Sequence, residues 1–156
     1  MRGSAALAYK DPLRVGEPDN TAWNPVTRLT NANPWLDDAL KSLLPFVDMS
    51  NDWDGYGSPA PSRQVVATCL AILKSLAIDE PPLPRIQPVP GGGIQLEWSE
   101  RDKFLEVEIL PNSNVQFLAI PGPDQVIEGN FPIERDDLLR TLVRCVVPIV
   151  SAELRR

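Results

Sequence analysis

Two aspartates, Asp52 and Asp54, lie in the most distinctive stretch of the chain, Asn51-Asp52-Trp53-Asp54-Gly55-Tyr56-Gly57. Their alternate spacing after Ser50 follows the first ligand positions of a calcium-binding loop, in which carboxylate oxygens coordinate the ion. The pattern fails at Pro61, because a proline stands where such a loop needs its bidentate glutamate. We therefore expect no metal ion and no cofactor at this loop.

Turn chemistry explains the same loop better. We expect Asp52 and Asp54 to accept hydrogen bonds from the backbone of the loop itself, and the glycines on either side of Tyr56 to adopt positive φ angles. Trp53 and Tyr56 would then pack the loop onto the core. In the alternative interpretation, these two aromatic side chains are anchors for a partner protein, since Trp and Tyr carry much of the binding energy at interfaces.

Three glutamates, Glu97, Glu106 and Glu108, alternate with apolar residues at the period of a β-strand. Paired carboxylates can perform general acid and base chemistry without other groups. Nothing in this spacing selects an acid and a base, so we expect a polar sheet face that points away from the core. Such a face is either solvated or an acidic platform for a basic partner protein.

Composition excludes much catalytic chemistry, because the chain has no histidine. An imidazole cannot activate a serine or cysteine nucleophile here, and histidine-ligated zinc is excluded. Cys69 and Cys145 each lie in an apolar helical run, where a cysteine behaves as a small buried hydrophobic residue. The run Gly91-Gly92-Gly93 lacks the Lys-Ser/Thr pair of a phosphate-binding loop and predicts a hairpin turn. We predict that the protein is not an enzyme.

The formal net charge of −6 over 156 residues disfavours direct nucleic-acid binding, which needs a basic footprint. A basic protein partner suits this charge better. No stretch reaches the roughly 20 apolar residues that a membrane helix needs, so we expect no membrane partner. Two isolated cysteines without a recognisable signal peptide predict a reducing, cytoplasmic location.

Residues 1–33 differ from the rest of the chain, because prolines and asparagines are scattered through them and no apolar period persists. They predict an extended or partly disordered arm, followed by a single domain over residues 34–156. Trp23 in this arm would gain nothing from staying in water, so we expect it to contact the domain or a partner protein.

Two helices are predicted at the start of the domain. Asn33 can cap the first with its side-chain oxygen, Pro34 suits its first position, and Pro45 predicts a kink or an early end. Ser62 is the candidate cap of the second helix. Apolar residues cover much of the circumference of this second helix, which predicts burial on more than one side.

From Pro84 onward the apolar period changes to two, which is typical of half-buried strands. Strands are expected around residues 86–89, 94–98, 105–109 and 115–120, with a possible fifth at 125–128. Short connections between them favour an antiparallel meander of four or five strands.

A C-terminal helix is predicted over residues 132–154, with a bend at Pro148. The fold class is then α+β, with two N-terminal helices and one C-terminal helix packed on one face of the sheet. Leu142, Val146 and Ile149 lie on the apolar side of the last helix. Incomplete cover of these three residues would favour a homodimer through this helix.

The succession Trp53-Asp54-Gly55-Tyr56-Gly57 and Gly92-Gly93-Ile94-Gln95-Leu96-Glu97-Trp98 resembles a family of small, mostly uncharacterised bacterial proteins. The resemblance extends over residues 48–129. It includes Pro59, Pro61 and the stretch Leu105-Glu106-Val107-Glu108-Ile109. It implies a bacterial origin and a compact domain, and it carries over no activity and no catalytic residue.

Acidity without an assembled catalytic site favours a non-catalytic interaction protein. It would be an acidic accessory subunit, or an antitoxin-like or immunity-like inhibitor of a bacterial partner protein. The candidate contact residues are Trp23, Trp53, Tyr56, Glu97, Glu106 and Glu108. The alternatives are a carboxylate-based, metal-dependent hydrolase centred on Asp52 and Asp54, and a self-associating structural subunit.

Overall fold

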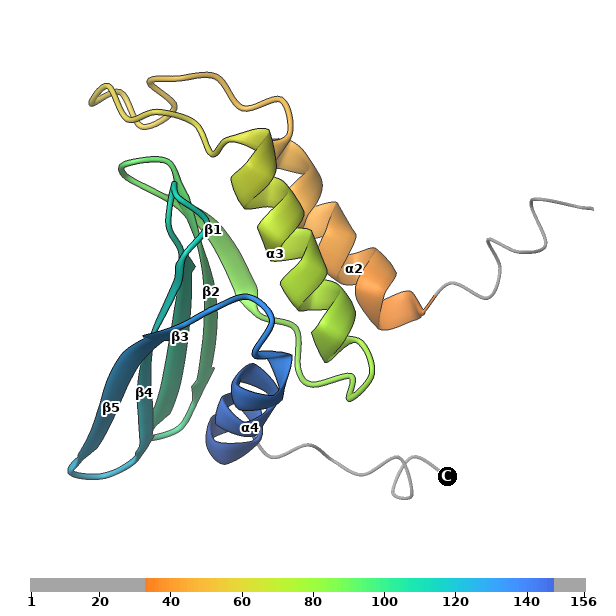
Figure 1. The fold of residues 1–156 in the computed structure, drawn as a ribbon, viewed down its shortest axis with the longest axis vertical. Helices are drawn as coiled ribbons and strands as arrows, with labels where there is room; N and C mark the ends of the chain where they lie inside the picture. Colours follow the sequence, from red (N-terminus) through yellow and green to blue (C-terminus); the bar gives the residue numbers. More distant parts are fainter. Residues whose placement is uncertain (1–32, 148–156) are drawn as a thin grey trace, which may run out of the picture. The chain divides into compact units, whose positions relative to one another are not determined.

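The computed structural model describes residues 33–147, whose path is drawn in Figure 1. This part of the chain holds three α-helices, one short 3-10 helix and a five-stranded sheet. The predicted α+β class is confirmed, and the helices lie on one face of the sheet (Figure 1). Most of the predicted N-terminal arm, with Trp23, lies outside the described residues, as does Ile149.

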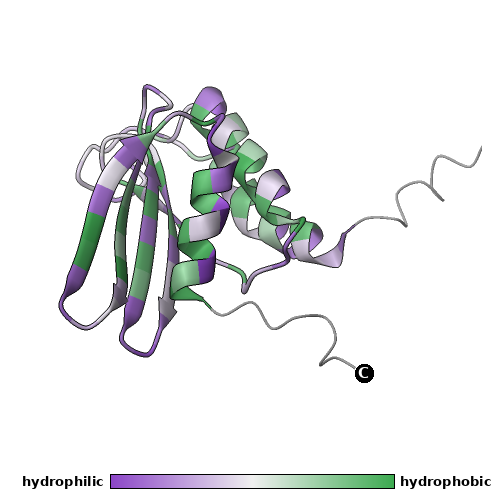
Figure 2. Ribbon diagram, turned by 60° about the horizontal axis from the view of Figure 1, so that its bottom comes forward, coloured by the Kyte–Doolittle hydropathy of each residue, from purple (hydrophilic) through white to green (hydrophobic). Residues whose placement is uncertain are grey.

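The strands form an antiparallel meander in the order β1-β2-β3-β4-β5. They are β1 (Arg85–Val89), β2 (Gly93–Glu100), β3 (Lys103–Ile109), β4 (Val115–Gly122) and β5 (Gln125–Phe131). All five predicted strands are therefore confirmed, and β5 continues to Phe131, beyond its predicted end. Figure 2 shows apolar and polar bands alternating along the strands, as the period of two requires.

The register places the apolar side chains of neighbouring strands on one face, which we call the inner face. Leu96 lies opposite Val107, and Leu105 lies opposite Ala119. All four are buried. Trp98 shares this face and is also buried, as its place in the alternation predicts. We call the opposite side of the sheet the outer face.

Helix α2 (Pro34–Leu43) begins at the predicted position. The Asn33 side-chain oxygen accepts hydrogen bonds from two backbone N–H groups of the first turn, at 2.9 and 3.3 Å. Pro45 stands just after the helix, and the chain continues as the 3-10 helix η2 (Leu44–Phe46). The predicted early end is therefore confirmed.

Helix α3 (Arg63–Leu76) is the central helix of the layer that covers the inner face. The hydroxyl of Ser62 caps it by accepting a hydrogen bond from the Val65 backbone N–H at 3.2 Å. The helix packs against α2, β2 and β3, and it also contacts the C-terminal helix. Its predicted burial on more than one side is confirmed, and Cys69 at its centre is fully buried.

Helix α4 (Asp136–Val146) is shorter than the helix predicted over residues 132–154. Phe131 still belongs to β5, and the turn after it is closed by a hydrogen bond from the Arg135 N–H to the Pro132 carbonyl at 2.9 Å. At its other end the helix stops before Val147, which has extended φ and ψ angles of −115° and 113°. Val147 precedes a proline, and such residues avoid the helical region.

The sequence predicted that incomplete cover of three apolar residues on this helix would favour a homodimer. For the two of these residues that the structure describes, the predicted exposure is wrong. Leu142 and Val146 are only 7% and 0% exposed. They belong to the core of the chain itself, because α4 packs against β2, β3 and β4. Within residues 33–147, no helix is long and apolar enough to cross a membrane.

Two tryptophans hold the proline-rich connection between α3 and β1. The indole N–H of Trp98 donates to the Pro82 carbonyl at 2.8 Å, and that of Trp35 donates to the Pro81 carbonyl. Buried indoles need such a partner, because a desolvated N–H without one is costly. These contacts fix the point at which the chain leaves the helices and enters the sheet.

An ion-pair cluster joins the same connection to α4. Asp79 accepts hydrogen bonds from Arg140 at 2.7 Å and from Arg144 at 2.8 Å. The hydrogen bond from Arg140 is the main cause that holds the pKa of Asp79 below its usual range. The two arginines lie on successive turns of one helix, so a single carboxylate can bind both.

We predict that Asp79→Asn lowers the free energy of unfolding at pH 7 by about 1–2 kcal/mol, because the hydrogen bonds donated by Arg140 and Arg144 lose their acceptor charge. The folded-state pKa is lowered, so this contribution is present above the ordinary carboxyl pKa of about 3.9 and is lost as the pH falls below it. Urea unfolding at pH 7 and at acidic pH measures the difference. If the wild type and Asp79→Asn differed in stability by the same amount at pH 7 and at acidic pH, the ion-pair explanation would be contradicted.

A second prediction concerns Gly93 at the start of β2. A Cβ at this position would lie 2.8 Å from the Ile109 carbonyl oxygen and 2.8 Å from a Val89 methyl carbon. We expect Gly93→Ala to destabilise the fold by roughly 1–3 kcal/mol, because backbone on β3 would have to move. Gly122→Ala is the matched control, since its Cβ would meet nothing within 4 Å. Equal stability of the two variants in urea unfolding would refute this.

Candidate functional site

The outer face of the sheet carries no helix within residues 33–147 (Figure 1). Glu97 lies directly opposite Glu106, and Glu108 lies opposite Gln95 on the same two strands. The alternation of β2 and β3 turns all of these side chains away from the buried inner face. The structure therefore brings the three glutamates of the sequence prediction together on one surface.

Strands β4 and β5 extend this surface with residues that the sequence did not single out. Leu118 lies opposite Glu106 and Glu128, and Gln116 lies opposite Glu108 and Asn130. Glu128 was missed because the sequence of β5 alternates poorly. Val126 and Ile127 are consecutive apolar residues, and Gly129 has no side chain to mark a face. Only strand register shows that Glu128 joins the other glutamates.

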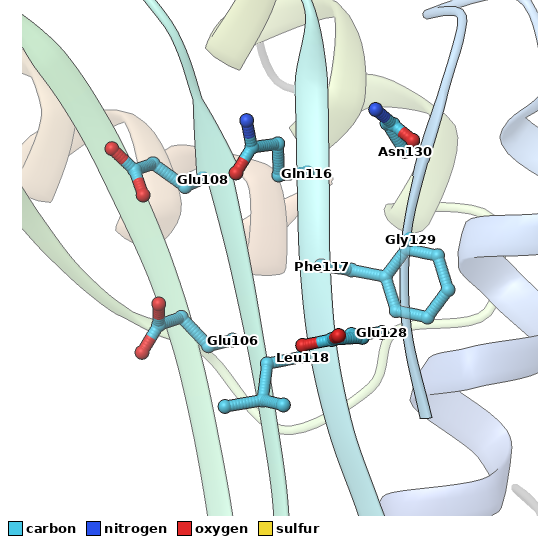
Figure 3. A pocket seen from close by; sticks show the side chains of 8 residues that line it. All are labelled: Glu106, Glu108, Gln116, Phe117, Leu118, Glu128, Gly129 and Asn130. Carbon is cyan, nitrogen blue, oxygen red and sulfur yellow. The ribbon is translucent and has the colours of Figure 1, made fainter. Parts of the chain in front are cut away.

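A hollow of about 430 Å³ lies on this surface between β3 and β5. Figure 3 shows Glu106 and Glu108 on one side of it and Glu128 on the other, with Gln116 and Leu118 of β4 between them. The ring of Phe117 points away from the carboxylates and lies against Gly129. We call this feature the acidic hollow.

A second hollow of about 370 Å³ shares Gln116 and Asn130 with the acidic hollow. Its remaining walls include Leu110, Phe131 and Pro132. The outer surface over β4 and β5 therefore changes from carboxylate walls at one end to amide and apolar walls at the other. A ligand lying along it would meet charge first and then neutral groups.

The carboxylates of the acidic hollow repel one another. Burial raises the pKa of Glu106, and the charges of Glu108 and Glu97 raise it further. Gln95 donates a hydrogen bond of 3.5 Å to Glu97, which leaves the negative charge in place. Like charges opposite each other on neighbouring strands destabilise a sheet. A bound cation would remove this repulsion.

The chemistry of the acidic hollow suits an organic cation. An ammonium or guanidinium group would find carboxylate acceptors on two sides, and its aliphatic stem could lie on Leu118. The amides of Gln116 and Asn130 add neutral donors and acceptors. Among the side chains of residues 33–147, no group of three His, Cys, Asp or Glu residues is arranged to hold a metal ion.

In the loop around Trp53, Asp52 and Asp54 accept hydrogen bonds from the backbone of the loop itself, as predicted. Asp52 accepts a hydrogen bond from the Gly57 N–H at 2.7 Å, and Asp54 accepts one from the Tyr56 N–H at 2.9 Å. The Ser58 hydroxyl also donates to Asp54, and this is the main cause that lowers the pKa of Asp54. Both carboxylates are thus engaged within the loop. This geometry adds no support to a hydrolase centred on them.

The predicted packing of the loop aromatics is wrong for Tyr56, which is 93% exposed. Trp53 is partly buried, and its indole donates to the Pro59 carbonyl at 3.3 Å, within the loop itself. The loop reaches the sheet elsewhere, because the Cβ position of Gly92 lies 3.5 Å from the Ala60 carbonyl oxygen. The two glycine-rich motifs of the sequence are therefore neighbours.

The two cysteines differ, although the sequence predicts burial for both. Cys69 is buried in α3, and burial raises the pKa of its thiol to about 12. Cys145 is exposed, because it lies on the side of α4 that points away from the sheet. The prediction is wrong for Cys145, since its apolar neighbours in sequence lie on the opposite side of the helix.

We predict that Glu106→Gln raises the free energy of unfolding at pH 7 by roughly 0.2–1 kcal/mol, because it removes a charge that its neighbours repel. The folded-state pKa of Glu106 is raised, so the wild type loses stability as the pH rises through that pKa. The two proteins should therefore converge near pH 4. Glu128→Gln, on the same face but opposite Leu118, is the control. If urea unfolding showed a larger gain in stability for Glu128→Gln than for Glu106→Gln, the explanation by charge repulsion would be contradicted.

No protein-family model, curated protein or solved structure matches the chain. The resemblance to small bacterial proteins therefore stays a hypothesis, and the functional conclusion depends on the geometry of the acidic face.

Proposed function

We propose that this is a non-catalytic interaction protein that binds a basic segment of a partner protein on the outer face of its sheet. One observation carries the proposal. Four glutamates from β2, β3 and β5 gather on the outer face of the sheet, and three of them, Glu106, Glu108 and Glu128, line a hollow large enough for a cationic side chain. In this role it would act as an accessory subunit or as an inhibitor of the partner.

The electrostatic cost of the arrangement supports this proposal. Glu97 and Glu106 lie opposite each other although each would be more stable beside a neutral or basic residue. Burial and these neighbours raise the pKa of Glu106. A lysine or arginine from a partner would convert repulsion into attraction, and the free energy released would appear as affinity.

The polar and apolar residues around the glutamates favour a polypeptide over a free ion. Leu118, Phe104 and Ile120 lie on the same outer side and are half-buried. Leu118 adjoins the carboxylates, where it can contact the aliphatic part of a lysine or arginine side chain. A charged surface of this kind also accelerates encounter with an oppositely charged protein, and this effect weakens as salt is added.

Tyr56 is a second candidate contact. It is fully displayed on a loop that its own hydrogen bonds hold in shape, so little conformational entropy would be lost on binding. Tyrosines presented in this way are frequent anchors at interfaces. Its role is independent of the acidic hollow, so each can be tested alone.

Charge neutralisation tests the proposal. The probe is a fluorescent lysine-rich peptide, and the variant is Glu97→Gln/Glu106→Gln/Glu108→Gln. We expect this variant to bind the peptide about tenfold more weakly in fluorescence anisotropy, because three partly exposed ion pairs are removed. Added salt should weaken wild-type binding.

The control variant is Asp48→Asn/Glu80→Gln/Glu134→Gln, which removes the same number of charges at exposed positions away from the outer face. It should bind almost as tightly as the wild type. Equal losses in the two variants would mean that net charge alone attracts the peptide, and the proposed surface would be rejected.

A further inference from the structure

The two edges of the sheet differ in their capacity to accept another strand. Edge strand β1 has five residues, and Pro88 within it has no N–H to donate to a neighbour. Edge strand β5 has seven residues and contains neither proline nor lysine. Proteins commonly protect an edge with such residues, because its unpaired N–H and C=O groups can bind another chain. The proline protects β1, whereas β5 has a single charged residue, Glu128, and an irregular register only near its start.

Two exposed apolar side chains of β5 also indicate that β5, rather than β1, is the edge that accepts another strand. Val126 is 67% exposed, and Ile127 is 48% exposed although it belongs to the inner face. Ala119, opposite Ile127, is buried. Cover by α3 and α4 centres on β2, β3 and β4, so Ile127 lies beyond it. An added strand would cover both exposed side chains.

The pairing of β4 with β5 defines where such a strand would lie. The register is irregular between Ala119 and Gly122, and it is regular from Ile127 to Phe131. Phe131 is buried and Pro132 follows it, so the edge ends there. The regular part is long enough for several main-chain hydrogen bonds, which is how extended peptides bind at sheet edges.

We infer that β5 binds an extended segment of the partner protein as an additional strand of the sheet. The segment alternates basic and apolar residues. Its basic side chains lie on the outer face beside Glu128 and reach toward the acidic hollow, and its apolar side chains lie beside Ile127. This inference rests on the proposed function, since the acidic outer face provides the charge complementarity.

Charge also distinguishes a basic partner from a second copy of this chain. Pairing of β5 with another β5 would join two acidic outer faces into one continuous surface and bring their glutamates closer together. The net charge of −6 on each copy opposes such an approach. A basic segment instead lowers the repulsion that already exists around Glu106.

The test uses a fluorescent synthetic peptide that alternates lysine and valine. Its control is the same peptide with every backbone N–H methylated, which keeps the charge but cannot pair as a strand. We expect the first peptide to bind at least about tenfold more tightly than the second. Hydrogen exchange of the 156-residue chain should show new protection of backbone amides between Val126 and Asn130 when the peptide is bound.

Two variants that leave the net charge unchanged test the contribution of the β5 edge. Ile127→Ser should weaken binding of the alternating peptide several-fold, whereas Ile78→Ser should not. Ile78 is 71% exposed in the connection after α3 and serves as a control of equal chemistry. Circular dichroism confirms that both variants are folded before the comparison is made.

The outcomes separate the inference from the proposed function. Suppose that the two peptides bind the wild type equally well and that both lose binding in Glu97→Gln/Glu106→Gln/Glu108→Gln. This result would overturn strand addition but would still support binding at the acidic surface. If neither peptide bound at millimolar concentration, both the strand addition and the proposed function would be overturned. A dimer of the free protein in light scattering, with the β5 amides already protected, would overturn the inference because a second copy would occupy the edge.

Discussion

Burial of one face of the meander sets the positions of most other side chains in this structure. The inner side chains of β2, β3 and β4 are removed from water by α3 and α4, and this burial supplies the main favourable free energy of folding. Because successive residues of a strand point to opposite faces, burying Leu96 and Leu105 forces Glu97 and Glu106 onto the outer face. The position of the acidic surface is therefore a consequence of core packing.

The connection between the helices and the sheet has to be fixed for that packing to work. Trp35 and Trp98 hold it through backbone carbonyls of two prolines, and Asp79 joins it to α4 through two arginines. Each contact links segments far apart in the sequence. The prolines also reduce the conformational freedom of the unfolded connection, which lowers the entropy lost on folding.

The acidic outer face gives up some stability without any gain inside the domain. Neutral or oppositely charged pairs would suit the same backbone, yet Glu97 and Glu106 lie opposite each other and Glu108 raises the pKa of Glu106 further. Interaction sites commonly carry such a cost, because charges that repel in the free protein attract a complementary partner. No other strand of residues 33–147 pairs with the outer edge of β5, and this edge adjoins the acidic surface, so main-chain and charge recognition can act on the same segment.

Most helices and strands could be predicted from the sequence, because the signals that specify them lie within or next to each element. The caps at Asn33 and Ser62, the strand alternation and the hairpin glycines needed no distant contact to be recognised. Tertiary structure decided what depends on distant neighbours. It moved the start of α4 beyond Pro132, buried Leu142 and Val146 in the core, and exposed Cys145 and Tyr56. It also placed Glu128 across the acidic hollow from Glu106. These outcomes follow from strand register and helix packing, which join residues that the sequence keeps apart.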